Sequence, residues 1–187
     1  MKSGGIVVFP TDTIYGIGCD PFNDKAVGRI FAIKGRDARK ALPVLAYSTE
    51  YAEKIVILGD SGRTLARKYW PGALTIVAPI RDRRISHTLS ASSDSLGVRV
   101  PANRCTLSLL SHCNYIVGTS ANRSGERSPK SMQEVLDSAL EGYDALLDGG
   151  PAEKGRESTI VDVTGKPKII REGAISAHEV MEALEKL

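Results

Sequence analysis

Four short polar clusters in this 187-residue chain contain the side chains that binding and catalysis would need. They are residues 11–15 (TDTIY), 34–40 (KGRDARK), 120–128 (SANRSGERS) and 158–159 (ST). Each cluster follows, or lies at the end of, an apolar segment with the pattern of a strand or a helix. In open α/β sheets, ligands bind in the crevice beyond the carboxyl ends of the strands. The clusters, with Arg99 and Arg171 late in two further strands, are therefore candidates for one shared site.

Hydroxyl groups and cations dominate these clusters, and none of them contains a histidine. The three histidines and three cysteines of the chain show no metal-ligand spacing and no C-x-x-C pair. We therefore expect neither a built-in metal site nor a disulfide framework. The formal net charge of +3 at pH 7 is compatible with a polyanionic partner such as a nucleotide or RNA.

Several common nucleotide and hydrolase motifs are missing. The segment GIGCDP has Pro21 where a dinucleotide-binding fingerprint needs its third glycine, which makes that motif weak. Neither the P-loop pattern nor the G-x-S-x-G pattern of serine hydrolases occurs. A bound nucleotide would have to be held by other groups.

Hydrophobic periodicity predicts strands and helices that alternate along the chain. The predicted strands are residues 4–9, 42–47, 73–80, 96–101, 115–118, 144–148, 158–163 and 166–171. The predicted helices are residues 23–34, a short helix from residue 48, 61–70, 102–113, 131–140 and one from residue 176. Residues 81–95 and 119–130 are predicted to be loops. The alternation indicates α/β architecture, and the adjacent strands near residues 158–171 indicate that part of the sheet is antiparallel.

Length and composition favour one soluble domain over residues 1–187. No apolar run approaches the roughly 20 residues of a membrane-spanning helix. The N-terminal segment MKSGGIVVF is too short for a secretion signal, so we expect a cytoplasmic location.

Six motifs in order along the chain resemble the YrdC family of L-threonylcarbamoyladenylate synthases. They are PTDTIYG, the K-x-R of KGR, GVRVP, the S-x-N of SAN, STIVD and the R-x-G at residues 171–173. Together they extend from about residue 4 to residue 173. Each motif alone is a weak signal. All six in the family's order are a strong signal, because six independent matches in that order would not be expected by chance. The chain resembles the short, single-domain form of the family.

The resemblance implies a twisted, open, mixed parallel and antiparallel sheet flanked by helices around a large concave basic cavity. It implies that L-threonine, bicarbonate and ATP, with Mg²⁺, are condensed to threonylcarbamoyl-AMP and pyrophosphate. The product would pass to a separate transferase that modifies tRNA. The alternatives are a non-catalytic module of the same fold that binds double-stranded RNA or tRNA, a carbamoyl-transfer role, and a relative with altered activity.

The resemblance also assigns a role to individual residues. Lys34 and Arg36 would be catalytic, because they would neutralise the triphosphate. The residues expected to bind threonine are Thr13, Tyr15, Arg99 and Ser158. The residues expected to bind ATP are Lys34, Arg36, Lys40, Ser120, Asn122, Ser128 and Arg171. Gly16 and Gly18 would let the backbone approach the small substrate closely.

Each assignment has a purely structural alternative. Lysine and arginine at a helix end complement the helix dipole. Thr11 and Asp12 are typical of a turn in which the side chains bond their own backbone. Arg99 would otherwise form an ion pair at the edge of a strand, which contributes little. The glycine-rich segment 149–157 is compatible with a lid over the site and with a flexible hairpin.

Overall fold

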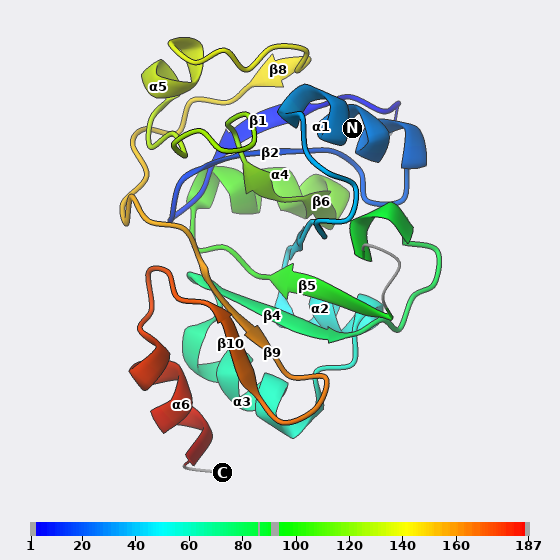
Figure 1. The fold of residues 1–187 in the computed structure, drawn as a ribbon, viewed down its shortest axis with the longest axis vertical. Helices are drawn as coiled ribbons and strands as arrows, with labels where there is room; N and C mark the ends of the chain where they lie inside the picture. The colour runs from blue at the N-terminus through cyan, green and yellow to red at the C-terminus, as the bar shows by residue number, and fades with distance from the viewer. Residues whose placement is uncertain (1–2, 86, 91–93, 186–187) are drawn as a thin grey trace.

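The computed structural model describes residues 3–85, 87–90 and 94–185, and its strands form two mixed sheets (Figure 1). The first sheet has the order β7 (Thr119–Ser120), β2 (Tyr15–Gly18), β1 (Val7–Pro10) and β8 (Ala145–Leu146). The second has the order β10 (Lys168–Arg171), β9 (Thr159–Asp162), β4 (Leu74–Pro79), β5 (Ser95–Arg99), β3 (Val44–Ala46) and β6 (Tyr115–Val117). Both sheets contain parallel and antiparallel pairs. The predicted α/β class and mixed sheet are confirmed, although the strands are divided between two sheets.

Helices flank both sheets. They are α1 (Asp24–Lys34), α2 (Thr49–Ile55), α3 (Gly59–Tyr69), α4 (Arg104–Cys113), α5 (Met132–Leu136) and α6 (Ala177–Glu185), with a 3₁₀ turn η1 (His87–Ser90). In Figure 1, α6 lies beside α3 on the second sheet, whereas α1 and α5 lie near the first. None of the helices in the described ranges is long and apolar enough to cross a membrane.

The local signals for α1 give the predicted helix. The Asn23 side chain accepts a hydrogen bond from the backbone N–H of Ala26 at 3.1 Å, which caps the first turn. Gly35 follows the last turn with φ 57°, a left-handed conformation that glycine adopts without a steric penalty. Val27, Ile30 and other apolar residues on one face are buried in the core. The helix therefore ends at Lys34 with its K-x-R segment beside the sheets.

Helix α5 is shorter than expected. The prediction ran from residue 131 to residue 140, but the helix ends at Leu136. The Ser138 hydroxyl donates to the Val135 carbonyl at 2.7 Å and accepts from the Leu140 N–H at 3.3 Å. Side-chain bonds of this kind replace the helical backbone bonds of the next turn. The predicted loop over residues 81–95 contains η1, and its residues 86 and 91–93 lie outside the described part of the chain.

Strand β2 is absent from the sequence-based expectation, which had one strand over residues 4–9 followed by a turn. Instead β1 turns at Thr11 and returns antiparallel as β2, with Val7 opposite Gly18. The Thr11 hydroxyl accepts the N–H groups of Thr13 at 3.1 Å and Ile14 at 3.2 Å. Thr11 thus forms the expected turn. The segment YGIG was overlooked because it has only four residues and two are glycine, which is depleted in strands.

Gly18 is required by the fold, and it is not among the residues that line the cavity described below. A Cβ atom at this position would lie 1.8 Å from the carbonyl oxygen of Val117 in β6. The Val117 N–H also donates to the Cys19 carbonyl at 2.8 Å, which joins the end of β2 to the second sheet. The close approach of these two backbones therefore requires glycine.

Candidate active site between the two sheets

A cavity lies where the β1–β2 turn faces β3, β4, β5 and β9 of the second sheet. Six of the residues expected to bind threonine or ATP line it: Thr13, Arg36, Arg99, Ser120, Ser158 and Arg171. The other five are not among the lining residues: Tyr15, Lys34, Lys40, Asn122 and Ser128. Gly16 also lines the cavity. The structure therefore brings together groups that are up to 158 positions apart in the chain, from Thr13 to Arg171.

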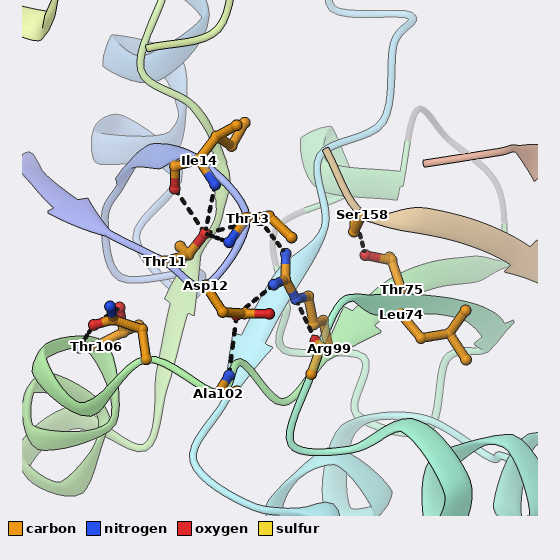
Figure 2. Close-up of polar contacts among 12 residues, drawn as sticks. Thr11, Asp12, Thr13, Ile14, Leu74, Thr75, Arg99, Ala102, Thr106 and Ser158 are labelled. Carbon is orange, nitrogen blue, oxygen red and sulfur yellow. Dashed lines mark hydrogen bonds and ion pairs between the residues drawn. The ribbon is translucent and has the colours of Figure 1, made fainter. Parts of the chain in front are cut away.

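Arg99 extends from the end of β5 to the β1–β2 turn, as Figure 2 shows. Its guanidinium donates to the Asp12 carboxylate at 2.6 Å, the Thr13 hydroxyl at 2.9 Å and the Gly72 carbonyl at 2.8 Å. A guanidinium has five N–H groups, so these contacts leave two. Burial lowers the pKa of Arg99, and the charge of Asp12 opposes that shift. Arg99 is thus held rigidly on the cavity wall.

Asp12 is almost completely buried, with an exposed side-chain fraction of 2%. Its Oδ1 accepts both the Arg99 guanidinium and the backbone N–H of Ala102, the latter at 3.0 Å. Its Oδ2 is buried without a hydrogen-bond partner in the described part of the chain. The ion pair is therefore a buried one and differs from the exposed strand-edge pair that was the alternative for Arg99. The turn alternative had the Asp12 side chain bonding the backbone of its own turn. Its hydrogen bonds go instead to Arg99 and Ala102.

Two hydroxyl pairs stand on opposite sides of Arg99 in Figure 2. The hydroxyls of Thr11 and Thr13 are 2.8 Å apart in the turn. The hydroxyls of Thr75 in β4 and Ser158 beside β9 are 2.9 Å apart. All four residues line the cavity. Such hydroxyls donate and accept, so this wall suits a small polar ligand that carries a hydroxyl or a carboxylate.

Lys34 is buried and supports the loop that contains Ser120 and Asn122. Its ammonium group, at the end of α1, donates to the backbone carbonyls of Ser120 and Asn122, the second at 2.6 Å. The pKa of Lys34 is lowered to about 8, mainly by burial and also by the charge of Arg36, while the charges of Glu157 and Glu126 oppose the shift. Lys34 therefore places the loop that carries Ser120 on the cavity wall.

Arg36, Arg171 and Glu157 form the charged part of the wall. The Arg36 guanidinium donates to the backbone carbonyls of Lys40 at 3.1 Å and Ala41 at 3.0 Å. Burial lowers the pKa of Arg36, the charge of Arg171 lowers it further, and Glu157 opposes both. Arg171 forms an ion pair with Glu157 and donates to the Ser158 carbonyl at 3.0 Å. Two guanidinium groups therefore act on the same space, which favours an anion.

The polar loop after β7 is held by internal contacts. The Asn122 amide donates to the carbonyls of Arg123 at 2.9 Å and Glu126 at 2.8 Å, while its Oδ1 is buried and unpartnered in the described ranges. The Ser128 hydroxyl donates to Glu157 at 2.8 Å. Lys40 is exposed on a different loop, the one between α1 and β3. Asn122 and Ser128 therefore shape the site from behind its surface.

Tyr15 fastens the segment 149–157 to the hairpin. Its hydroxyl donates to the Gly150 carbonyl at 2.8 Å. Burial raises the pKa of this hydroxyl. The backbone N–H groups of Ala152 and Lys154 donate to the carbonyls of Lys130 at 2.7 Å and Asp12 at 3.0 Å. These hydrogen bonds dock the segment beside the cavity, and Tyr15 contributes its hydroxyl to this docking.

Sequence reasoning missed several residues of the site. Thr75, Thr119 and Glu157 line the cavity, and Asp12 holds Arg99. Thr75 lies inside the apolar strand pattern of β4, so nothing local marks it. Glu157 directly precedes the STIVD motif, and that position was the available signal. No group of three or more histidine, cysteine, aspartate or glutamate side chains that would hold a metal ion occurs within the described ranges.

Comparison with known proteins places this architecture in a family. The family model Sua5_yciO_yrdC, described as "Telomere recombination", matches residues 1–173. A Mycobacterium tuberculosis protein named putative threonylcarbamoyl-AMP synthase is 34% identical over 98% of this chain and 85% of its own length. The threonylcarbamoyl-AMP synthase of Pyrococcus abyssi is 32% identical over the whole of this chain. The chain spans 56% of that relative's length.

Solved structures agree with the sequence comparison. The crystal structure of Pyrococcus abyssi Sua5 complexed with L-threonine has a TM-score of 0.92 and 33% identity over 97% of this chain and 54% of its own. Escherichia coli YciO has a TM-score of 0.84 at 21% identity over 96% of this chain and 87% of its own, which shows a shared fold. With the family model covering nearly the entire length, the resemblance is confirmed: this chain belongs to the Sua5/YciO/YrdC family.

Proposed function

We propose that this chain is an L-threonylcarbamoyladenylate synthase, which condenses L-threonine, bicarbonate and ATP to threonylcarbamoyl-AMP and pyrophosphate. One observation carries the proposal: a single cavity combines the buried Arg99 and its hydroxyl neighbours with the guanidinium groups of Arg36 and Arg171. The first set suits an amino acid with a hydroxyl, and the second suits a polyphosphate. The similarity to a structure that contains L-threonine supports the first assignment.

The threonine would lie against the hydroxyl wall. The two N–H groups that Arg99 has outside its protein contacts match a carboxylate, because a guanidinium binds that group with two parallel hydrogen bonds. Thr13 and the Thr75–Ser158 pair offer partners for the threonine hydroxyl. Tyr15 would contribute by holding the segment 149–157 in place. The amino group, once carboxylated by bicarbonate with loss of water, becomes a carbamate.

The adenylate forms when a carbamate oxygen attacks the α-phosphorus of ATP and the bond to pyrophosphate breaks. The carbamate is already an anion, so this step needs alignment and charge stabilisation more than a strong base. Arg36 and Arg171 would stabilise the charge on the phosphates, and Lys34 would hold the loop of Ser120 and Asn122 against the nucleotide. Ser128 and Lys40 complete the proposed ATP site. Mg²⁺ would enter with ATP and reduce the charge of the triphosphate.

The product is a mixed carbamic–phosphoric anhydride, which is reactive and needs an acceptor. We propose a separate transferase that passes the threonylcarbamoyl group to tRNA, with both proteins in the cytoplasm. Binding of tRNA by the chain itself belongs to the same proposal. Protein that binds RNA tightly without converting ATP in the presence of threonine would instead favour an RNA-binding role.

Pyrophosphate release tests the proposed activity. Purified protein with L-threonine, bicarbonate, Mg²⁺ and ATP is expected to release pyrophosphate, because all the reactants share one cavity. Omission of threonine is expected to remove most of the release, and L-alanine, which lacks the hydroxyl, should restore little of it. Release that does not depend on threonine, or no release from folded protein, would refute the proposal.

A further inference from the structure

Glu157 is the one acidic side chain among the described residues that line the cavity. One carboxylate oxygen forms the ion pair with Arg171, and the other accepts the Ser128 hydroxyl at 2.8 Å. The side chain is 35% exposed, so solvent and ligands reach it. A carboxylate in this place is unexpected, because it repels the phosphates that the neighbouring guanidinium groups would attract.

The backbone fixes the position of this carboxylate. The Glu157 carbonyl accepts the N–H of Ala174 at 2.8 Å. Gly173 packs so closely that a Cβ atom there would lie 2.2 Å from the same carbonyl oxygen. Glu157 is therefore anchored to the segment after β10, beside Arg171.

The guanidinium groups of Arg36 and Arg171 both interact with Glu157, whereas that of the third cavity arginine, Arg99, is paired with Asp12. It is the direct partner of Arg171, and its charge counteracts the lowering of the Arg36 pKa. Arg36 itself donates only to backbone carbonyls in the hydrogen bonds described above, so its charge has no carboxylate partner in direct contact. Arg36, Arg171 and Glu157 together carry a net charge of +1. Arg36 and Arg171 alone would carry a charge of +2. The carboxylate thus halves the charge available to an anion.

We propose that Glu157 is a specificity-determining residue: a built-in anion that occupies Arg171 and limits how much negative charge the cavity accepts. A ligand must displace the carboxylate from Arg171 or bind beside it, and the repulsion grows with each additional negative charge on the ligand. A triphosphate whose charge is partly neutralised by a cation is therefore preferred over the free polyanion. The inference rests on the proposed function only in taking this cavity as the phosphate site.

The test compares wild type with Glu157→Gln, which removes the charge and keeps a group that accepts from Ser128. Binding of inorganic pyrophosphate and of inorganic phosphate is measured by calorimetry in magnesium-free buffer. We expect Glu157→Gln to bind pyrophosphate about tenfold more tightly than wild type, and to gain less for the less charged phosphate. The gain should shrink at high salt because the interaction is electrostatic and partly exposed.

Two further variants separate charge from structure. Glu153→Gln removes the same charge from an exposed position on the same segment and should leave both affinities unchanged. Glu157→Asp keeps the charge with a shorter side chain and should show no gain. Melting temperatures check that all the variants are folded.

Three results would overturn the inference. They are a pyrophosphate affinity in Glu157→Gln that is equal to or below that of wild type, an equal gain in Glu153→Gln, and equal gains for the two anions. If Glu157 only supported Ser128 and Arg171 structurally, Glu157→Gln would bind pyrophosphate no more tightly than wild type. The outcome is separable from the proposed function, because the probes need neither threonine nor turnover. Threonine-dependent pyrophosphate release without the affinity gain would sink this inference alone.

Discussion

At the scale of single residues, the Asp12–Arg99 pair shows how the site is held in position. Both side chains are at least 94% buried, and the pair joins the β1–β2 turn of one sheet to β5 of the other. Removing two charges from water is costly, and loss of one partner leaves the other buried and uncompensated. The pair thus keeps Arg99 on the cavity wall only while both partners are present.

Asp12→Asn is therefore expected to lower the free energy of unfolding by about 3 kcal/mol, because Arg99 keeps its charge in a buried place. Urea denaturation measures the change. Asp37→Asn is a matched control, since its ion pair with Arg39 is on the surface, and we expect no measurable effect. An Asp12→Asn protein as stable as wild type would show that the pair contributes nothing to the fold.

At the scale of secondary-structure elements, the contact between β2 and β6 sets how the two sheets meet. The Val117 N–H bonds the Cys19 carbonyl, and Gly18 lies against the Val117 carbonyl with no space for a side chain. The chain then continues from β6 into β7, which pairs with β2 through Gly16 and Ser120. This contact consequently determines where Ser120 lies relative to the hairpin.

Gly18→Ala is expected to destabilise the protein by about 3 kcal/mol, because the added methyl group meets backbone atoms that cannot move without separating the sheets. Thermal or urea unfolding measures it. Gly28→Ala provides the control: this exposed glycine in α1 has nothing within 4 Å of an added Cβ, so alanine should stabilise the helix by about 0.5–1 kcal/mol. Equal effects of the two substitutions would contradict the proposed role of the contact.

At the scale of the whole molecule, the cavity exists only because the two sheets face each other. Thr13 and Gly16 come from the first sheet and its turn, whereas Arg99, Ser158 and Arg171 come from the second. A ligand that contacts both sheets fixes their relative position, and a second ligand then meets a site that is already ordered. The two proposed substrates should therefore influence each other.

L-threonine is expected to increase the affinity for ATP by about fivefold, and ATP to increase the affinity for L-threonine by the same factor. Calorimetric titration of each ligand, with and without saturating amounts of the other, measures this coupling. D-threonine serves as the control ligand, because it has the same groups in the wrong arrangement. Affinities that are independent of the second ligand would argue against one shared cavity.

Local signals in the sequence indicated most of the elements, although they missed β2 and placed the end of α5 too late. The Asn23 cap and Gly35 mark the ends of α1, the apolar runs give β1, β4 and β9, and the polar clusters lie where these elements end. Such signals act between residues close in the chain, so they are readable without a structure. The six motifs are also short stretches of sequence, so their order along the chain was enough to indicate the family.

The tertiary structure alone decided which side chains face the cavity and which support it from behind. Lys34 and Tyr15 belong to recognisable motifs, yet neither lines the cavity and both bond backbone carbonyls, whereas Thr75 and Glu157 line the wall. The partner of Asp12 is 87 positions away, and only the crossing of two sheets brings the two charges together. Sequence patterns report local periodicity and turn chemistry, while the direction of a side chain at a junction depends on packing between segments distant in the chain.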